Sequence, residues 1–210
     1  MEEVLEVYRR VYDVRFPQVC VDEGSKQLVS CTRESLPMEP GKPERVDYEY
    51  EREGFCSVFV ACEPLAGKRI VQARPRRTAC EWAEFMRELV EVHYAQAEKI
   101  VVVMDNLNTH TIASLYQAFQ PAHALAIASK LELHYTPVHG SWLNMAEIEL
   151  SVLARQALSG RVGSVQEVQQ RVDEWQQRRN REQAGIQWRF TTQEARITLH
   201  HLYPKVTHVL

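Results

Sequence analysis

The sequence predicts an α/β fold built on a mixed sheet with helices on both faces. Three observations lead to this class. Extended segments dominate the N-terminal part, helices alternate with short apolar strands in the middle, and the C-terminal part is helical. With 210 residues, 45% of them hydrophobic and 25% charged, the composition is that of a globular protein long enough to bury a full core.

The N-terminal part combines a short helix with extended segments. Residues 1–13 read as a helix with Val11 and other apolar residues on one side. Residues 17–31 read as two strands around a turn at "EGS". The proline-rich and then charged stretch 32–54 reads as an irregular insertion or a long hairpin, and loops of this length are often functional.

The middle of the chain alternates strands with helices. "FCSVFVACEP" and "KRIVQARP" read as strands, and "TACEWAEFMRELVEVHYAQ" reads as a helix that opens with the capping-box pair Thr78 and Glu81. The strand "KIVVVMD" and two short helices follow, in "TIASLYQAF" and from Pro121 to Lys130. The long helix has an apolar face formed by Trp82, Phe85, Leu89 and Val92.

One more strand and three helices complete the chain. "LELHYTP" reads as the strand, and a helix begins after Asn144. Ser164 and Glu167 form a second capping-box pattern, and the last helix begins near Thr191. This order divides the chain into a linker helix, a core that includes the insertion, and a helical extension. The boundaries that we expect are 1–16, 17–160 and 161–210.

Charge and cysteine content narrow the classes of function. A net charge of -3 and a pI near 6.3 argue against a protein that binds nucleic acid over its whole surface, but they allow a local basic groove. The five cysteines form no CxxC pair, so reduced thiols are expected rather than disulfides or zinc. The N-terminus does not read as a signal peptide, and no apolar run approaches the roughly 20 residues that span a bilayer. A cytoplasmic protein without a membrane partner is therefore expected.

Acidic residues follow two apolar strands. Asp22 follows "PQVCV" and Asp105 follows "KIVVVM". If these strands are parallel neighbours, both carboxylates lie at the end of the sheet where open α/β folds bind ligands. Glu147 adds a third acid on the first turn of a helix. Clustered carboxylates need cations, and ligands that are all oxygen suit Mg²⁺ or Mn²⁺. Two such ions about 4 Å apart can clamp the attacking and leaving oxygens of a phosphoryl displacement.

Each acid also has a purely structural interpretation. Asp105 could form a turn or cap the helix that follows it. Glu147 could belong to a cap that starts at Asn144. Glu23 and Glu149 lie close by in the sequence and compete for the same catalytic roles. Spacing alone leaves these alternatives open.

Several long phrases resemble a known family. "CVDEGSKQL", "VVVMDNLNTHTIASLYQAF" and "LELHYTPVHGSWLNMAEIELSVLARQAL" are similar to bacterial insertion-sequence transposases of the mariner-like superfamily, in the branch named for insertion sequence six-thirty. "IQWRFTTQEARITLHHLYP" is similar to the end of the same proteins, so the resemblance covers the chain from about Met1 to Pro204. It implies an RNase H-like, or retroviral integrase-like, fold with a D, D, E catalytic triad.

The resemblance also assigns the triad. Its two aspartates fall on Asp22 and Asp105, and the N-P-I-E phrase of the relatives aligns with "NMAE", which selects Glu147 over Glu149. We expect two Mg²⁺ or Mn²⁺ ions with Asp22 as the ligand that bridges them. The segment between Asp105 and Glu147 is longer than in many relatives, and the extra length fits around "QPAHALAIAS".

The resemblance implies DNA cleavage and strand transfer at the ends of an insertion sequence, a target dinucleotide TA, and a homodimer when active. Relatives usually carry an N-terminal helix-turn-helix domain that reads the element's ends, and this sequence begins just before the first catalytic strand. It is therefore expected to be a separately encoded half, a truncated copy or an excised part, acting in the bacterial cytoplasm at the nucleoid. The alternatives are a truncated, non-cleaving regulator that pairs with a full-length transposase and, third, a generic RNase H-like nuclease.

Candidate DNA contacts lie in several segments, and each of them is also compatible with an ordinary surface. His110 and His139 are more often hydrogen-bonding groups of loops than ligands, and Trp142 could pack in the core rather than stack on DNA. The insertion could clamp DNA or a partner subunit, but its acids Asp47, Glu49, Glu51 and Glu53 speak against phosphate contacts there. The candidates are Lys68, Arg69, Arg74, Arg76, Arg77, His139, Trp142, Arg178, Arg179 and Arg181.

Overall fold

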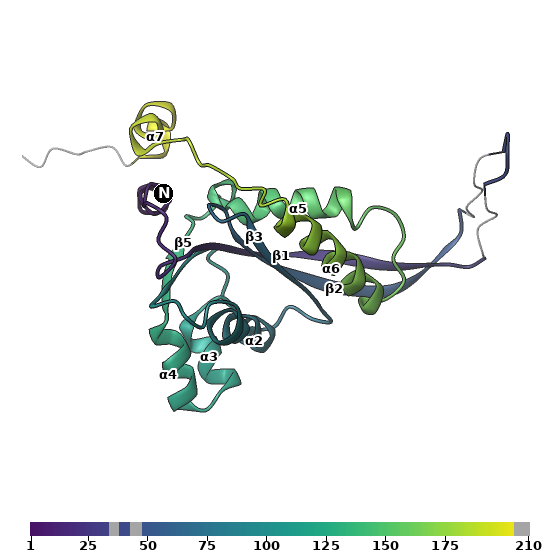
Figure 1. The fold of residues 1–210 in the computed structure, drawn as a ribbon, viewed down its shortest axis with the longest axis horizontal. Helices are drawn as coiled ribbons and strands as arrows, with labels where there is room; N and C mark the ends of the chain where they lie inside the picture. The colour runs from purple at the N-terminus through teal and green to yellow at the C-terminus, as the bar shows by residue number, and fades with distance from the viewer. Residues whose placement is uncertain (34–37, 43–47, 204–210) are drawn as a thin grey trace, which may run out of the picture.

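A computed structural model describes residues 1–33, 38–42 and 48–203. Its centre is a five-stranded sheet with the order β3-β2-β1-β4-β5 (Figure 1). The central strand β1 pairs antiparallel with β2 and parallel with β4. Mixed pairing of this kind confirms the predicted α/β class. The strands are β1 (Gln18–Cys31), β2 (Tyr50–Glu63), β3 (Lys68–Arg74), β4 (Ile100–Met104) and β5 (Leu131–Tyr135).

Helices cover both faces of the sheet, as predicted (Figure 1). One apolar cluster joins α2, α3 and α4 to one face, and another joins α5 and α6 to the other face. The helices α1 and α7 pack against each other near one end of the sheet. The helices are α1 (Glu2–Tyr8), α2 (Ala79–Glu88), α3 (Ile112–Ala118), α4 (Pro121–Ser129), α5 (Met145–Gln156), α6 (Val165–Arg181) and α7 (Thr192–Thr198). Short helical turns are η1 (Leu89–His93), η2 (Ser141–Leu143) and η3 (His200–Leu202).

The first long strand corrects the prediction of two strands around "EGS". β1 runs without a break through this phrase, and Glu23, Gly24 and Ser25 pair in register with β2. A Cβ atom at Gly24 would lie 3.3 Å from a methyl group of Leu150. The glycine therefore lets α5 approach the middle of a strand, and it does not mark a turn.

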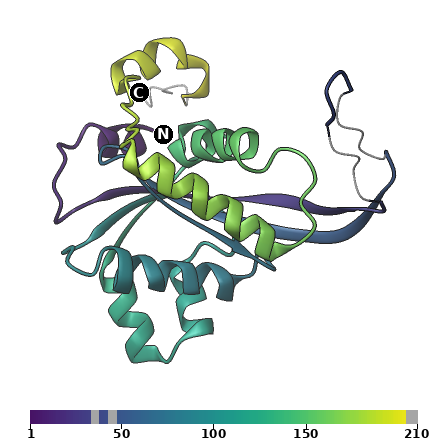
Figure 2. The same ribbon diagram turned by 45° about the vertical axis from the view of Figure 1, so that its right-hand side comes forward.

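The insertion predicted at 32–54 includes parts of a long hairpin. β1 extends to Cys31 and β2 begins at Tyr50, so both arms reach well past the helices (Figure 2). Residues 34–37 and 43–47, including the predicted acid Asp47, lie outside the described residues. The described arms fit the long-hairpin interpretation of this segment.

Two apolar positions were assigned wrongly to helical faces. Val11 is exposed because α1 ends at Tyr8. Val92 is 65% exposed because α2 widens at its end into η1, a π-helical turn in which the Tyr94 amide donates to the carbonyl of Leu89. One extra residue in a turn rotates everything after it, so a spacing of 3.6 residues no longer predicts which side chains are buried.

Candidate active site

Two neighbouring strands bring the two predicted aspartates together. β1 and β4 run parallel, and their last paired residues are Cys20 and Val103. Asp22 lies two residues beyond this pair and Asp105 follows β4 directly. Contrary to the sequence interpretation, Asp22 does not end its strand, because β1 continues past it and pairs it with Val60. At Asp22 the backbone is therefore held in register by β2, whereas its pairing with β4 has already ended at Cys20.

The environment of Asp22 disfavours negative charge. Burial is the main cause that raises the pKa of this carboxyl, to about 7. The backbone N–H of Glu23 donates to Asp22 Oδ1 at 2.8 Å and opposes the rise. The charges of Asp105, Glu23 and Glu147 raise the pKa further, in that order. The structure thus brings Asp105, Glu147 and Glu23 within electrostatic reach of Asp22.

The start of α5 places Glu147 in this group. The Asn144 side chain accepts from the Ala146 amide at 3.1 Å and caps the helix, while its Nδ2 donates to the carbonyl of Val21 at 2.9 Å. These two bonds tie the first turn of α5 to β1 beside Asp22. Glu147 lies on that turn and is half-buried.

The competing acid Glu149 has a different environment. It is 1% exposed and forms a two-point pair with Arg69, at 2.7 and 3.0 Å. Arg179 adds a third contact at 3.3 Å. Because its charge is already neutralised inside the protein, Glu149 is a structural acid and not a candidate ligand.

Asp105 is anchored by a histidine that the sequence interpretation treated only as a loop group. His110 Nδ1 lies 2.6 Å from Asp105 Oδ1, and His110 Nε2 lies 2.9 Å from Glu23 Oε2. Burial opposes protonation of the ring, but the contacts with the two carboxylates outweigh it and raise the pKa of His110 to about 9. The nearby histidine in "MDNLNTH" was the available signal, but its second partner Glu23 lies far away in the sequence.

These side chains fit a hard divalent cation. Asp22, Asp105 and Glu147 offer only oxygen, which suits Mg²⁺ or Mn²⁺. Within the described part of the chain, the second oxygen of each aspartate has no donor, so it remains available to a cation. Among the described residues, Glu23, Asp105 and His110 form a group whose ligand atoms lie within 4.8 Å of one another. In that group His110 already holds both carboxylates, so we assign it to support of the site.

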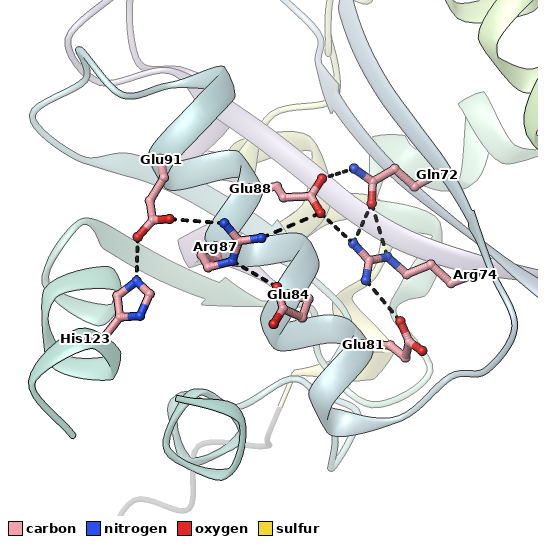
Figure 3. Close-up of polar contacts among 8 residues, drawn as sticks. All are labelled: Gln72, Arg74, Glu81, Glu84, Arg87, Glu88, Glu91 and His123. Atoms are coloured by element: carbon pink, nitrogen blue, oxygen red, sulfur yellow. Dashed lines mark hydrogen bonds and ion pairs between the residues drawn. The ribbon is translucent and has the colours of Figure 1, made fainter. Parts of the chain in front are cut away.

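Four predicted DNA contacts have partners inside the fold. Arg69 is 1% exposed, and its donors go to Glu149 and to two backbone carbonyls, so it cannot reach a phosphate. Arg74 is 14% exposed and pairs at 3.0 Å with both Glu81 and Glu88, within a charged network that joins β3 to α2 (Figure 3). Spacing on the sequence could not show that these arginines have partners inside the fold. Lys68 donates to the His93 carbonyl at 3.1 Å, and Arg179 contacts Glu149 as described above.

Other candidates remain at the surface. Arg76 and Arg77 are exposed between β3 and α2, and Arg77 Nε lies 3.7 Å from the carboxylate of Glu23 at the site. Trp142 is partly exposed on the segment that leads into α5, and its ring lies near Trp188 and Phe190. The other exposed candidates are His139, Arg178 and Arg181.

The strand order and the acids at the shared end of β1 and β4 define the RNase H-like class of α/β folds. A family model described as DDE superfamily endonuclease matches residues 17–169, more than half of the chain, so the chain belongs to this family. The match includes all three predicted acids. A comparison with curated protein sequences finds no match. No helix in the described residues is long and apolar enough to cross a membrane.

Solved structures of the Mos1 mariner transposase share the fold. The paired end complex with Mn is 17% identical, with a TM-score of 0.53, over 87% of this chain and 56% of that chain. The strand transfer complex is also 17% identical, with a TM-score of 0.56 over the same shares. A pre-cleavage transpososome is 17% identical, with a TM-score of 0.53, over 90% of this chain and 61% of that chain. The chain thus spans less than two thirds of these proteins, and at this identity the likeness concerns the fold.

Proposed function

We propose that this chain is the catalytic domain of a DDE transposase of the bacterial insertion-sequence type. The observation that carries the proposal is that Asp105 and Glu147 lie within electrostatic reach of Asp22, at one end of β1 and β4. Family membership and the fold shared with a mariner transposase support it. Its reaction would be cleavage at the ends of an insertion sequence, followed by transfer of the 3′ end into target DNA at TA.

The three acids would hold two divalent cations, Mg²⁺ or Mn²⁺, with Asp22 between them. Bound cations would supply the activation of the attacking hydroxyl and the stabilisation of the leaving oxygen. The protein's own contribution is positional: the two strands fix the aspartates, and the Asn144 cap fixes the turn that carries Glu147. Burial around Asp22 keeps bulk water from screening these charges.

DNA is the partner that this chemistry requires. Arg77 lies beside Glu23 at the site, and with its exposed neighbour Arg76 it would contact the phosphates that flank the reacting bond. Trp142, on the segment that leads into α5, could stack on an unpaired base. A homodimer and a separately encoded helix-turn-helix half would complete the assembly in the bacterial cytoplasm.

The test is a cleavage and strand-transfer assay on duplexes that carry the inverted repeats flanking the gene, with Mg²⁺ or Mn²⁺. We expect cuts at the repeat ends, and we expect Asp105→Asn to abolish them. Glu98→Gln, an exposed acid before β4 at the opposite end of that strand, is the matched control and should cut normally.

Two results would contradict the proposal. Unchanged cleavage by Asp105→Asn would rule out this site. Cleavage of DNA or RNA without regard to the repeats would indicate a generic nuclease. If no metal supports cleavage and the chain co-purifies with a full-length transposase, the non-cleaving regulator would be the better description.

A further inference from the structure

We propose that His110 is a positioning residue that anchors one oxygen of Asp105 and leaves the other for a divalent cation, and that Glu23 holds His110 in place. The inference rests on the proposed function, because it concerns the same metal site. Neither His110 nor Glu23 belongs to the predicted triad of ligands.

The contacts form a chain of three side chains. Asp105 Oδ1 lies 2.6 Å from His110 Nδ1, and His110 Nε2 lies 2.9 Å from Glu23 Oε2. The side chains of His110 and Glu23 are 0% and 1% exposed, so water does not compete for the ion pair between them, whereas Asp105 is 25% exposed. A buried carboxylate needs a partner to remain in the fold, and the ring supplies one for Glu23.

The ring itself is fixed from several directions. Trp82 of α2 stacks on it with the ring centroids 5.8 Å apart. The His110 amide donates to the carbonyl of Leu107 at 2.9 Å, and the hydroxyl of Tyr135 on β5 donates to the carbonyl of His110 at 2.9 Å. The imidazole is therefore held by its neighbours before any ligand arrives, which is what a positioning group requires.

Glu23 also links the two aspartates. Its backbone N–H donates to Asp22 Oδ1 at 2.8 Å, and its side chain reaches Asp105 through the ring. Each aspartate thus has one oxygen anchored by the protein and one oxygen without a donor among the described residues. This arrangement explains why Glu23, although adjacent to Asp22, is not a competing ligand: its carboxylate is buried against His110.

Hydrogen-bond partners of metal ligands commonly change metal affinity by about 10- to 100-fold when they are removed. His110→Asn and His110→Gln test the role selectively. The amide nitrogen of Asn reaches about as far as Nδ1 and can still donate to Asp105. The amide nitrogen of Gln reaches about as far as Nε2, so it can contact Glu23 but not Asp105. Each variant loses one carboxylate contact, so a merely structural role would affect both alike.

The experiment measures Mn²⁺ binding by electron paramagnetic resonance of the free ion, on the full chain without DNA, together with melting temperature. We expect His110→Gln to weaken Mn²⁺ binding by about tenfold or more, and His110→Asn to stay within about threefold of the wild type. Glu98→Gln should bind as the wild type does. Equal losses in both His110 variants, or wild-type binding by His110→Gln, would overturn the inference.

A second variant covers the case in which the His110 variants do not fold. Glu23→Ala keeps the backbone bond to Asp22 and removes the support behind the ring, so Mn²⁺ binding should weaken several-fold; unchanged binding would overturn the inference. The proposed function fails separately, if the wild type neither binds Mn²⁺ nor cleaves the element ends. Normal binding and cleavage by the wild type, with the variants unaffected, would refute only the role of His110.

Discussion

Glu147 and Glu149 lie two residues apart on α5 and have opposite environments. Two positions on a helix are separated by about 200° of rotation, so the two side chains face different parts of the protein. Glu149 is buried against Arg69 and Arg179, which balance its charge. Glu147 is half-buried and adds its negative charge to that of Asp22. Glu149, whose charge is balanced by two arginines, therefore stabilises the fold. Glu147, whose neighbours include other acids, is the one expected to bind a cation.

The largest effect should come from Glu147, which has no cationic partner among the described residues. We expect Glu147→Gln to reduce metal-dependent cleavage below detection while the metal-free protein unfolds at the same or a slightly higher urea concentration, because one repelling charge is gone. Cleavage assays and urea titrations on the same preparation measure both quantities. Wild-type cleavage by this variant would remove Glu147 from the site and reopen the choice between the two glutamates.

Substitution of Glu149 should lower stability and leave cleavage intact. Glu149→Gln leaves the buried Arg69 and the partly exposed Arg179 without this carboxylate, and breaking a buried pair such as Arg69–Glu149 typically costs about 3–5 kcal/mol of unfolding free energy. The protein that remains folded should still cleave. The double variant Arg69→Met with Glu149→Leu is the control, since apolar replacement of a whole pair is often neutral. A stable Glu149→Gln variant without activity would contradict the division between the two acids.

The metal-free site should make stability depend on pH. Asp22 has a folded pKa of about 7 and an ordinary value of 3.8, so the unfolded chain loses this proton first as the pH rises. The contribution of Asp22 to stability therefore declines between about pH 4 and 7 and is constant above. His110 acts in a different window, because its raised pKa adds stability that is lost between its ordinary 6.5 and about 9.

Urea unfolding in the presence of a chelator, over a series of pH values, separates these two windows. Asp22→Asn should remove the decline between about pH 4 and 7 and leave the later one. If the stability of Asp22→Asn depends on pH as the wild type does, burial of Asp22 does not destabilise the metal-free protein.

The smallest effect should come from substituting an exposed arginine near the site. Arg77 is exposed beside the acids, unlike Arg69, which is buried. Arg77→Ala should weaken binding to element-end DNA modestly and lower the slope of log affinity against log salt by about one, as for one lost phosphate contact. Lys99→Ala, an exposed residue just before β4, is the control. If Arg77→Ala leaves the slope of log affinity against log salt unchanged, Arg77 does not contact a DNA phosphate.

Local patterns predicted the sheet and the acids, but not the partners of each side chain. Apolar strands that lead to Asp22 and Asp105 are visible in the sequence, and "NMAE" around Glu147 resembles the N-P-I-E phrase of similar transposases. The buried role of Arg69 is not visible, because its partner lies 80 positions away and "KRIVQAR" reads as an ordinary strand with basic residues. The contact between Glu23 and His110 has the same long-range origin. The π-helical turn that exposes Val92 leaves no mark in the spacing of apolar residues.

The unbroken strand β1 also limits how the gene can vary in length. Side chains alternate between the faces of a strand, so one residue inserted before Asp22 would exchange it with its buried neighbours on the other face. The register of β1 against β2 shifts between Leu28 and Val29, beyond the acids and toward the projecting arms of the hairpin. Homologous genes should therefore keep a constant number of codons from the start of β1 to Leu28, and insertions or deletions should accumulate after it.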